Sequence, residues 1–164
     1  MIDRGRDAWV FPGACLLAVA VVVGAYSNSF QNSFHFDDSH VVGNNLYIRS
    51  LKNVPLFFRD ARTGSSLPAN AVYRPLVSTT LALDYWLGGG MQMRQFHLSQ
   101  VAMLVLLGVM LFFLFLRLLS MAEEHWWNRY VALLAALLFS VHTANTEALN
   151  LIHVRSEILS TMGV

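Results

Sequence analysis

The stretch 98-LSQVAMLVLLGVMLFFLFL-116 decides the fold, because its 19 residues carry no charge and Arg117 closes it. At about 1.5 Å per residue, a helix of this length is roughly 28 Å long, which matches the hydrocarbon thickness of a bilayer. The stretch therefore predicts a membrane-spanning helix over residues 98–116.

The composition of the whole chain is typical of an integral membrane protein. Of its 164 residues, 55% are hydrophobic and only 13% are charged. The apolar residues are collected into long uncharged runs, which argues against a soluble domain with one dispersed core. A formal net charge of +1 without a basic block gives no reason to expect a nucleic-acid partner. The single cysteine, Cys15, cannot form an internal disulfide.

Three further segments have the apolar character of spans. Residues 8–26 carry no charge after Asp7 and predict a first span. Residues 127–145 reach spanning length only if the tryptophans at their start form an interfacial belt. Another apolar run begins near residue 156, and the sequence stops before that run could cross a membrane. We therefore expect residues 1–164 to be the N-terminal part of a larger membrane domain whose remainder is missing.

The first span has an alternative interpretation as a cleaved signal peptide. Arg4 and Arg6 precede the apolar run, and Ala25-Tyr26-Ser27 offers small residues at the spacing of a cleavage site. Cleavage would leave the later spans intact, so both alternatives predict a membrane protein.

The arginines near the span ends predict the orientation of the chain. Cytoplasmic segments collect Lys and Arg. The alternation of spans puts four arginines on one side and two on the other, namely Arg4, Arg6, Arg117 and Arg129 against Arg94 and Arg155. This bias predicts a cytoplasmic N-terminus and a loop 27–97 that lies outside the cell or in a lumen.

The outer loop 27–97 is far longer than an ordinary connection, and such loops usually have structure or function of their own. Over residues 46–62 apolar side chains recur at helical spacing between basic ones, which predicts a helix at the membrane interface. A solvated basic face is the alternative. Residues 64–68 and the glycines 88–90 predict turns.

The first candidate site in this loop is Phe36-Asp37-Asp38-Ser39. Adjacent carboxylates repel each other, so keeping both ionised near a low-dielectric boundary needs a cation, a metal or hydrogen-bond donors. One carboxylate can then act as a general base while the other holds a metal or orients the substrate. The alternative is that Asp38-Ser39 caps a helix that begins near His40.

The second candidate site is Tyr73-Arg74-Pro75-Leu76, which precedes an apolar stretch. Proline suits the first turn of a helix, so Arg74 would lie beside the positive end of a helix and could receive a phosphate. An arginine that anchors the helix to lipid headgroups is the alternative. Asp84, farther along the stretch, is expected to be a surface or pairing carboxylate.

The segment 142–157 follows the third predicted span and lies on the same side of the membrane as the Asp pair. If it is helical, five polar side chains share one face, namely His142, Thr146, Asn150, His153 and Glu157. Ionisable groups this close to hydrocarbon line a site or pair internally. The segment has no His-Glu-x-x-His pattern, which argues against a zinc hydrolase. An ion pair of Arg155 with Glu147 or Glu157 is the structural alternative.

Taken together, these motifs resemble a known family. The order is a first span, Phe36-Asp37-Asp38, Tyr73-Arg74-Pro75-Leu76, Phe96-His97, a His-Thr-x-x-Thr-Glu-Ala segment over 142–148, and Arg155-Ser156-Glu157. This order is similar to the N-terminal part of the GT-C membrane glycosyltransferases, of the transmembrane and tetratricopeptide-repeat O-mannosyltransferase type. The similarity covers roughly residues 28–163.

The resemblance implies an all-α integral membrane protein, a multispanning GT-C-type helical bundle with a long, partly helical first outer loop. It implies a glycosyltransferase that moves a sugar, mannose or a similar one, from a polyprenyl-phosphate donor to a hydroxyl of a protein or glycan acceptor. The membrane would be a bacterial inner membrane with the site facing the periplasm, or that of the endoplasmic reticulum with the site facing the lumen.

The resemblance also implies roles for individual residues. Asp37 and Asp38 would be catalytic, with Asp37 slightly favoured as the base and Asp38 as the residue that would hold a divalent metal, Mg²⁺ or Mn²⁺. Arg74 and Arg155 would bind the donor phosphate. Five further residues would line the pocket, namely His40, Tyr73, His142, Glu147 and Glu157.

The sequence departs from the family pattern in two places. Thr143 stands where a proline is common, and Asn145 stands where a second histidine is common. A non-catalytic membrane subunit or a transporter fragment is the competing interpretation, in which the Asp pair and Arg74 would handle an ion or a headgroup. That interpretation predicts polar residues at mid-depth of the spans, but residues 98–116 have only Ser99 and Gln100, both near one end.

Overall fold

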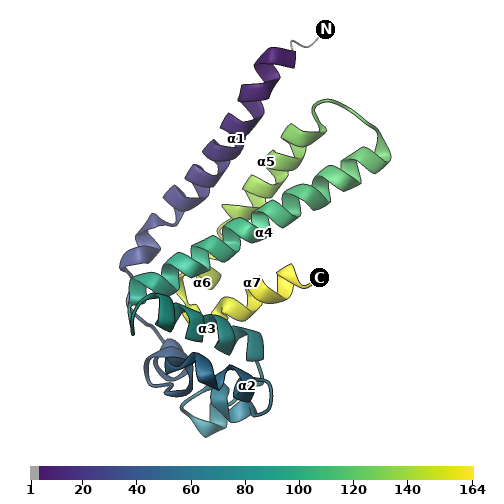
Figure 1. Ribbon diagram of the computed structural model, residues 1–164. Helices are drawn as coiled ribbons and strands as arrows, with labels where there is room; N and C mark the ends of the chain where they lie inside the picture. Colours follow the sequence, from purple (N-terminus) through teal and green to yellow (C-terminus); the bar gives the residue numbers. More distant parts are fainter. Residues whose placement is uncertain (1–3) are drawn as a thin grey trace.

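The computed structural model describes residues 4–164, with side chains from Trp9 onward. Within that part every regular element is helical, which confirms the predicted all-α class (Figure 1). Short 3₁₀ or π turns connect the α-helices, most of them between α1 and α3. The α-helices are α1 (Arg4–Ala25), α2 (Val54–Phe57), α3 (Pro75–Leu87), α4 (Met93–Ala122), α5 (Asn128–Ser140), α6 (Asn145–Asn150) and α7 (Arg155–Met162).

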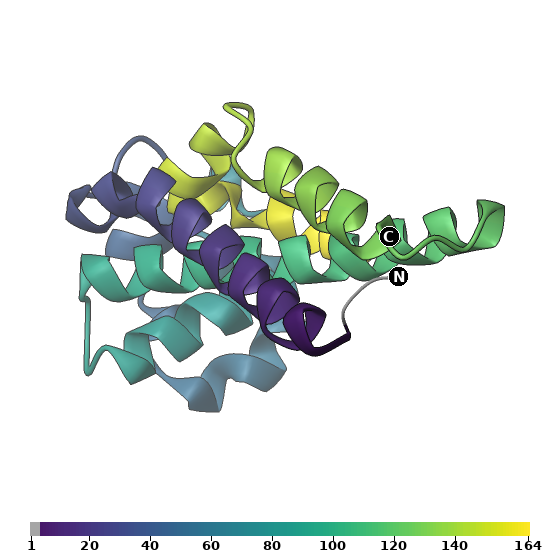
Figure 2. The same ribbon diagram turned by 90° about the horizontal axis from the view of Figure 1, so that it is seen from above.

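Three helices, α1, α4 and α5, extend to the same side of the molecule (Figures 1 and 2). Helix α5 packs against α4 with a face that repeats every four residues and is built mainly from small side chains, namely Asn128, Ala132, Ala136 and Ser140. A Cβ atom added to Gly108 of α4 would lie only 2.8 Å from the Oγ atom of Ser140. The two helices therefore approach closely at Gly108, as helices do where small residues meet.

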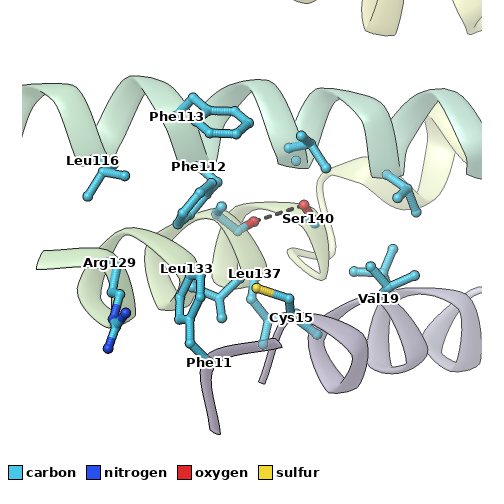
Figure 3. Close-up of a pocket in the computed structure, with 16 residues that line it drawn as sticks. Phe11, Cys15, Val19, Phe112, Phe113, Leu116, Arg129, Leu133, Leu137 and Ser140 are labelled. Carbon is cyan, nitrogen blue, oxygen red and sulfur yellow. Dashed lines mark hydrogen bonds between the residues drawn. The ribbon is translucent and has the colours of Figure 1, made fainter. Parts of the chain in front are cut away.

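An apolar cavity of about 520 Å³ lies between α1 and the α4–α5 pair (Figure 3). Aromatic and aliphatic side chains from all three helices line it, among them Phe11, Val19, Phe112 and Leu137. Among the described side chains of the lining, Arg129, at one end, is the only charged one, and none carries a carboxylate or an imidazole.

By length and composition, one helix in the described part of the chain, α4, could cross a membrane. It contains the predicted span 98–116 and is longer at both ends. Two other apolar helices are shorter, Trp9–Ala25 and α5. Many large apolar side chains of α4 face outward, for example Phe113, which is 61% exposed, and Leu118, which is 53% exposed.

Helix α5 is shorter than the predicted span 127–145, because it ends at Ser140. The side-chain amide of Asn145 donates to the Phe139 carbonyl at 2.6 Å, so a side chain satisfies a backbone group at the helix end. A turn follows, and α6 begins at Asn145. The run predicted from residue 156 corresponds to α7, which begins one residue earlier.

The segment between α1 and α4 folds into a compact unit around its own apolar cluster. The buried members of this cluster are Val42, Ile48, Phe57, Val77, Leu81, Ala82, Phe96 and Ile152. The predicted interfacial helix over 46–62 is wrong, since that stretch contains separate short turns and the four-residue α2. Extended backbone at Ser50 ends one turn and begins the next, and its hydroxyl accepts from the Lys52 backbone N–H. A continuous helix is thereby interrupted at Ser50.

This unit lies at the end of α4 opposite to the α4–α5 connection, and the chain from residue 141 returns to it (Figure 1). Helix α3 begins at Pro75, as predicted, and a turn with Gly89 and Gly90 at positive φ leads into α4. Arg117 lies toward one end of α4 and Arg94 toward the other, as expected from the alternation of spans. The side chains of Arg4 and Arg6, on which the predicted orientation also rests, lie outside the part that the structure describes.

Candidate functional site

A polar cavity of about 420 Å³ lies within the compact unit. It brings together segments that are far apart in the sequence, since residues near positions 37–41, 64–78 and 153 contribute to its wall. Its lining residues are Asp37, His40, Val41, Gly64, Ala69, Asn70, Val72, Arg74, Val77, Ser78 and His153. Asp37 of the Asp pair and the arginine before α3 therefore meet at one cavity.

The two aspartates of the pair have opposite environments. The Asp37 side chain is 59% exposed and lines the cavity, with Oδ1 lying 3.4 Å from Nε2 of His40. The Asp38 side chain is fully buried. Phe36, just before them, has a φ of 49°, a left-handed conformation that a bulky residue adopts at a cost. The turn at Phe36 therefore separates one carboxylate at the cavity surface from one behind it.

Hydrogen-bond donors surround the Asp38 carboxylate. Oδ2 accepts from the backbone N–H of His35 at 3.3 Å. Oδ1 accepts from the backbone N–H of His153 at 2.7 Å and lies 3.0 Å from Nδ1 of the same residue. The side chain makes no capping bond to the turn Ser39–Gly43, so the alternative that Asp38 is only a helix cap is wrong. Asp38 instead joins the first loop to the segment before α7.

His40 anchors the turn after the Asp pair. Its ring is largely buried, with Nδ1 3.0 Å from the Ser65 hydroxyl and Nε2 3.2 Å from the Asn70 amide nitrogen. Its backbone carbonyl accepts from the Ser66 N–H at 2.9 Å. Both ring nitrogens therefore have partners, and His40 holds the turn Ser39–Gly43 to the far wall of the cavity.

Arg74 supplies the cationic side of the cavity. It precedes Pro75 at the N-terminal end of α3, where the helix dipole is positive. Its side chain is exposed, and no acidic partner for it is present among the side chains that the structure describes, from Trp9 onward. Tyr73 lies outside the cavity lining, and its hydroxyl donates to the Phe58 carbonyl at 3.0 Å. Arg74 is thus the residue of this motif that could receive a phosphate.

Arg155 lies away from the cavity, fully buried in a polar network. Its Nη1 atom is 2.7 Å from Oδ2 of Asp84, which confirms the pairing alternative for that aspartate. Its Nε donates to Gln100 and its Nη2 donates to Ser99 and to the Phe96 carbonyl. Burial raises the pKa of the Asp84 carboxyl, and the Arg155 guanidinium opposes that rise. The alternative pairing of Arg155 with Glu147 or Glu157 is wrong, since its partner is Asp84. The predicted role of Arg155 in binding the donor phosphate would need a free guanidinium, and this one is engaged.

The remaining pocket residues of the prediction, His142, Glu147 and Glu157, are exposed and do not line the cavity. The predicted single face of 142–157 is wrong, because Leu151 has extended backbone and separates α6 from α7. His153 does line the cavity, although it was not among the predicted pocket residues. The sequence placed it only on the polar face of 142–157, whereas its partner Asp38 lies 115 positions away.

The residues present do not fit the predicted divalent metal at Asp38. Mg²⁺ usually keeps several waters in an octahedral set of oxygens, but the Asp38 side chain is fully buried and its oxygens face the His35 and His153 donors. Among the described residues, His, Cys, Asp and Glu side chains form no group of three that could hold a metal ion. The geometry therefore supports a cavity with a carboxylate, an imidazole and a guanidinium as its chemical groups.

Comparison with known proteins points in one direction. The chain is 27% identical to human protein O-mannosyl-transferase TMTC4 over 91% of its length, 28% identical to mouse TMTC3 over 89%, and 30% identical to human TMTC1 over 98%. These matches cover 21%, 15% and 18% of the respective relatives, so the chain spans about a fifth of their length or less. No family model and no solved structure matches. The resemblance inferred from the motifs is confirmed: over most of its length, this chain is a relative of the TMTC protein O-mannosyl-transferases.

Proposed function

We propose that the protein to which this chain belongs is a glycosyltransferase, which moves a mannosyl or similar residue from a polyprenyl-phosphate donor to a hydroxyl of a protein or glycan acceptor. The observation that carries the proposal is the convergence of Asp37 and Arg74 on one cavity, with Asp38 and His153 bonded beside it. The names of the relatives agree with mannosyl transfer to protein.

The proposal places the chain in a membrane as part of a multispanning GT-C-type bundle. Helix α4 is long enough to cross the bilayer, and its exposed apolar side chains would face lipid or further helices. Trp126 and Trp127 lie exposed at the α4–α5 connection, where an aromatic belt would sit. The cavity end would then face the periplasm of a bacterium or the lumen of the endoplasmic reticulum.

In this reaction the bond between the anomeric carbon and the phosphate oxygen breaks, and a new bond forms to the acceptor oxygen. The departing polyprenyl phosphate carries negative charge, which Arg74 would neutralise from the start of α3. The acceptor hydroxyl must lose its proton to a basic group beside the cavity, whose wall contains Asp37 and His153, with Asp38 buried behind it. Arg155 is left out of this scheme, because its guanidinium is buried against Asp84.

The transporter alternative gains no support from α4. Its polar side chains near the cavity end, His97, Ser99 and Gln100, are tied to backbone carbonyls or to the Asp84–Arg155 pair. They join α4 to the segment 148–155 and do not line the apolar cavity between the long helices.

The experiment is transfer by the full-length protein reconstituted in lipid. Radiolabelled polyprenyl-phosphate mannose and a Ser/Thr-containing peptide are supplied, and label in the peptide is counted with and without a metal chelator. We expect Asp37→Asn and Arg74→Ala to lose transfer. The matched controls are Asp60→Asn and Arg62→Ala, which alter an exposed ion pair of the same unit with Nη2 3.0 Å from Oδ2. Full transfer by both cavity variants would show that the proposal is wrong.

A further inference from the structure

We propose that His153 is the catalytic base of this cavity and that Asp38 is a positioning residue which acts through it. The inference rests on the proposed glycosyl transfer and assigns the proton transfer to one atom, Nε2 of His153.

The contacts of Asp38 fix the His153 ring. One carboxylate oxygen, Oδ1, meets both the backbone N–H and the Nδ1 atom of His153, at 2.7 and 3.0 Å. An ionised carboxylate can only accept hydrogen bonds, so Nδ1 must carry a proton to bond it. The neutral ring then has its lone pair on Nε2. A buried carboxylate that orients an imidazole in this way is the arrangement that hydrolases use to align a base.

The far side of the ring is available to a ligand. His153 lines the cavity and its side chain is 20% exposed. Within the described part of the chain, no partner of Nε2 is present. Charged or titratable groups that face the same cavity are Asp37, His40 and Arg74. Arg155, two residues farther along, is bound to Asp84 in the interior.

The other groups of the cavity suit this role less well. Both ring nitrogens of His40 are engaged, one by Ser65 and the other by Asn70 and Asp37. Asp38 is fully buried and cannot touch a substrate. The Asp37 side chain is 59% exposed and can stabilise the positive charge that develops on a sugar ring when its anomeric bond breaks. His153 is therefore the group whose ring is oriented by Asp38 and whose Nε2 atom has no partner among the described residues.

The acceptor oxygen forms a bond to the anomeric carbon as the bond from that carbon to the phosphate oxygen breaks. The electron pair of the broken bond leaves with the polyprenyl phosphate, beside Arg74. The proton of the acceptor hydroxyl passes to Nε2 of His153, and the resulting imidazolium is paired with the Asp38 carboxylate until it releases the proton to water.

The fold holds the base in place from two directions. Asp38 lies in the turn after Phe36, and that turn is tied to the loop 63–70 through His40. On the other side, Arg155 fixes the start of α7 to α4 through Gln100 and Ser99. The ring therefore lies between two anchored segments, as a preorganised catalytic group requires.

The decisive variant is His153→Asn in the full-length protein. An asparagine amide nitrogen occupies nearly the place of Nδ1, so it can still donate to Asp38 and hold the loop. It has no group in the place of Nε2. We expect kcat to fall about 10²- to 10⁴-fold. The KM for the donor should stay within about threefold of the wild-type value, and the thermal midpoint should stay close to that of the wild type. Asp38→Asn is expected to lower kcat similarly, because the wrong tautomer is favoured.

The matched control is His125→Asn, which alters another histidine–carboxylate pair at the opposite end of α4, with Nε2 3.1 Å from Oε1 of Glu123. Its transfer should be unchanged. If His153→Asn fails to fold, His153→Ala decides: restoration of transfer by added imidazole supports the base, and no restoration overturns it.

The outcomes separate the two proposals. A wild type that transfers no sugar from any polyprenyl-phosphate donor overturns the proposed function, and this inference with it. If the wild type is active and the His153→Asn variant folds and transfers sugar equally well, only the assignment of the base is overturned. His153 would then have a structural role, as a hydrogen-bond donor to Asp38.

Discussion

The Nη1 atom of Arg155 lies 2.7 Å from the Oδ2 atom of Asp84, and both side chains are almost completely shielded from solvent, with exposures of 0% and 4%. The same guanidinium donates to Gln100 and Ser99 of α4, so three helices, α3, α4 and α7, meet at one ion pair. His153 lies only two residues before this anchor. The position of the cavity histidine thus depends on a buried pair that does not line the cavity.

Removing one partner of the pair should be costly. Arg155→Met leaves the Asp84 carboxylate buried without a cation, and such changes lower the free energy of unfolding by about 3–5 kcal/mol. The double variant Asp84→Leu with Arg155→Met removes both charges and should recover most of that loss. Tryptophan fluorescence during denaturation of the full-length protein measures both. A double variant as unstable as Arg155→Met would show that the buried charge is not the cause.

The loss caused by Arg155→Met should depend on pH in a defined direction. Burial already raises the pKa of Asp84 above its ordinary value of 3.8, and removal of the opposing guanidinium should raise it further. The folded state of the variant then holds the proton more tightly than the unfolded state. Its stability relative to the wild type should therefore improve as the pH falls through that raised pKa, and the gap should be smallest below 3.8.

Unfolding free energies of the wild type and Arg155→Met, measured at neutral and at acid pH, test this sign. Arg62→Met is the control, since its partner Asp60 is exposed and is held ionised by that arginine, which lowers the pKa of Asp60. The gap between the wild type and Arg62→Met should be small at every pH. A gap for Arg155→Met that stays constant from neutral to acid pH would contradict the buried-carboxylate explanation.

Local patterns in the sequence predicted the elements that depend on local physics. The uncharged run 98–116 predicted the long helix α4, Pro75 predicted the first turn of α3, and the glycines 88–90 predicted the turn before α4. The placement of Asp37 and Arg74 on one cavity was implied only by the family resemblance, because no local pattern in the sequence predicts it.

Features that depend on the three-dimensional fold could not be predicted in this way. The spacing of 46–62 and of 142–157 fits a helix, but extended residues at Ser50 and Leu151 interrupt both. These breaks let Ile48 and Ile152 pack in the same apolar cluster. That contact joins residues far apart in the sequence, so a short stretch of sequence cannot reveal it. The bonds of Asp38 to His153 and of Asp84 to Arg155 likewise join residues whose proximity only the packed chain creates.

The backbone around Gly64 should tolerate no side chain. A Cβ atom at this position would lie 2.5 Å from the Val72 carbonyl oxygen, and both residues line the polar cavity. Because the obstacle is backbone, the wall must move, and we expect Gly64→Ala to lower stability by about 1–3 kcal/mol and to weaken transfer. Thermal unfolding and transfer rates check this.

Gly13→Ala is the matched control, since a Cβ atom there meets nothing within 4 Å. In the middle of α1 that substitution should leave stability unchanged or raise it, because alanine favours helix over glycine. Equal behaviour of the two alanine variants would show that the contact between Gly64 and Val72 does not constrain the cavity.

Substitutions of Arg74 should show whether its side chain binds a phosphate or is only a surface charge. It lines the cavity at the start of α3 without an acidic partner among residues 9–164. A guanidinium binds a phosphate through two parallel hydrogen bonds, whereas an ammonium offers a point charge. We therefore expect kcat/KM for the polyprenyl-phosphate donor to fall about 10-fold in Arg74→Lys and about 100-fold or more in Arg74→Ala.

Arg49→Lys is a suitable control, because Arg49 is exposed in the same unit, donates to the Gly43 carbonyl and lies outside the polar cavity. If Arg74→Lys and Arg74→Ala reduce transfer equally, a positive charge alone does not suffice and the effect depends on the paired hydrogen bonds of the guanidinium. If Arg74→Ala leaves transfer intact, α3 carries no donor site.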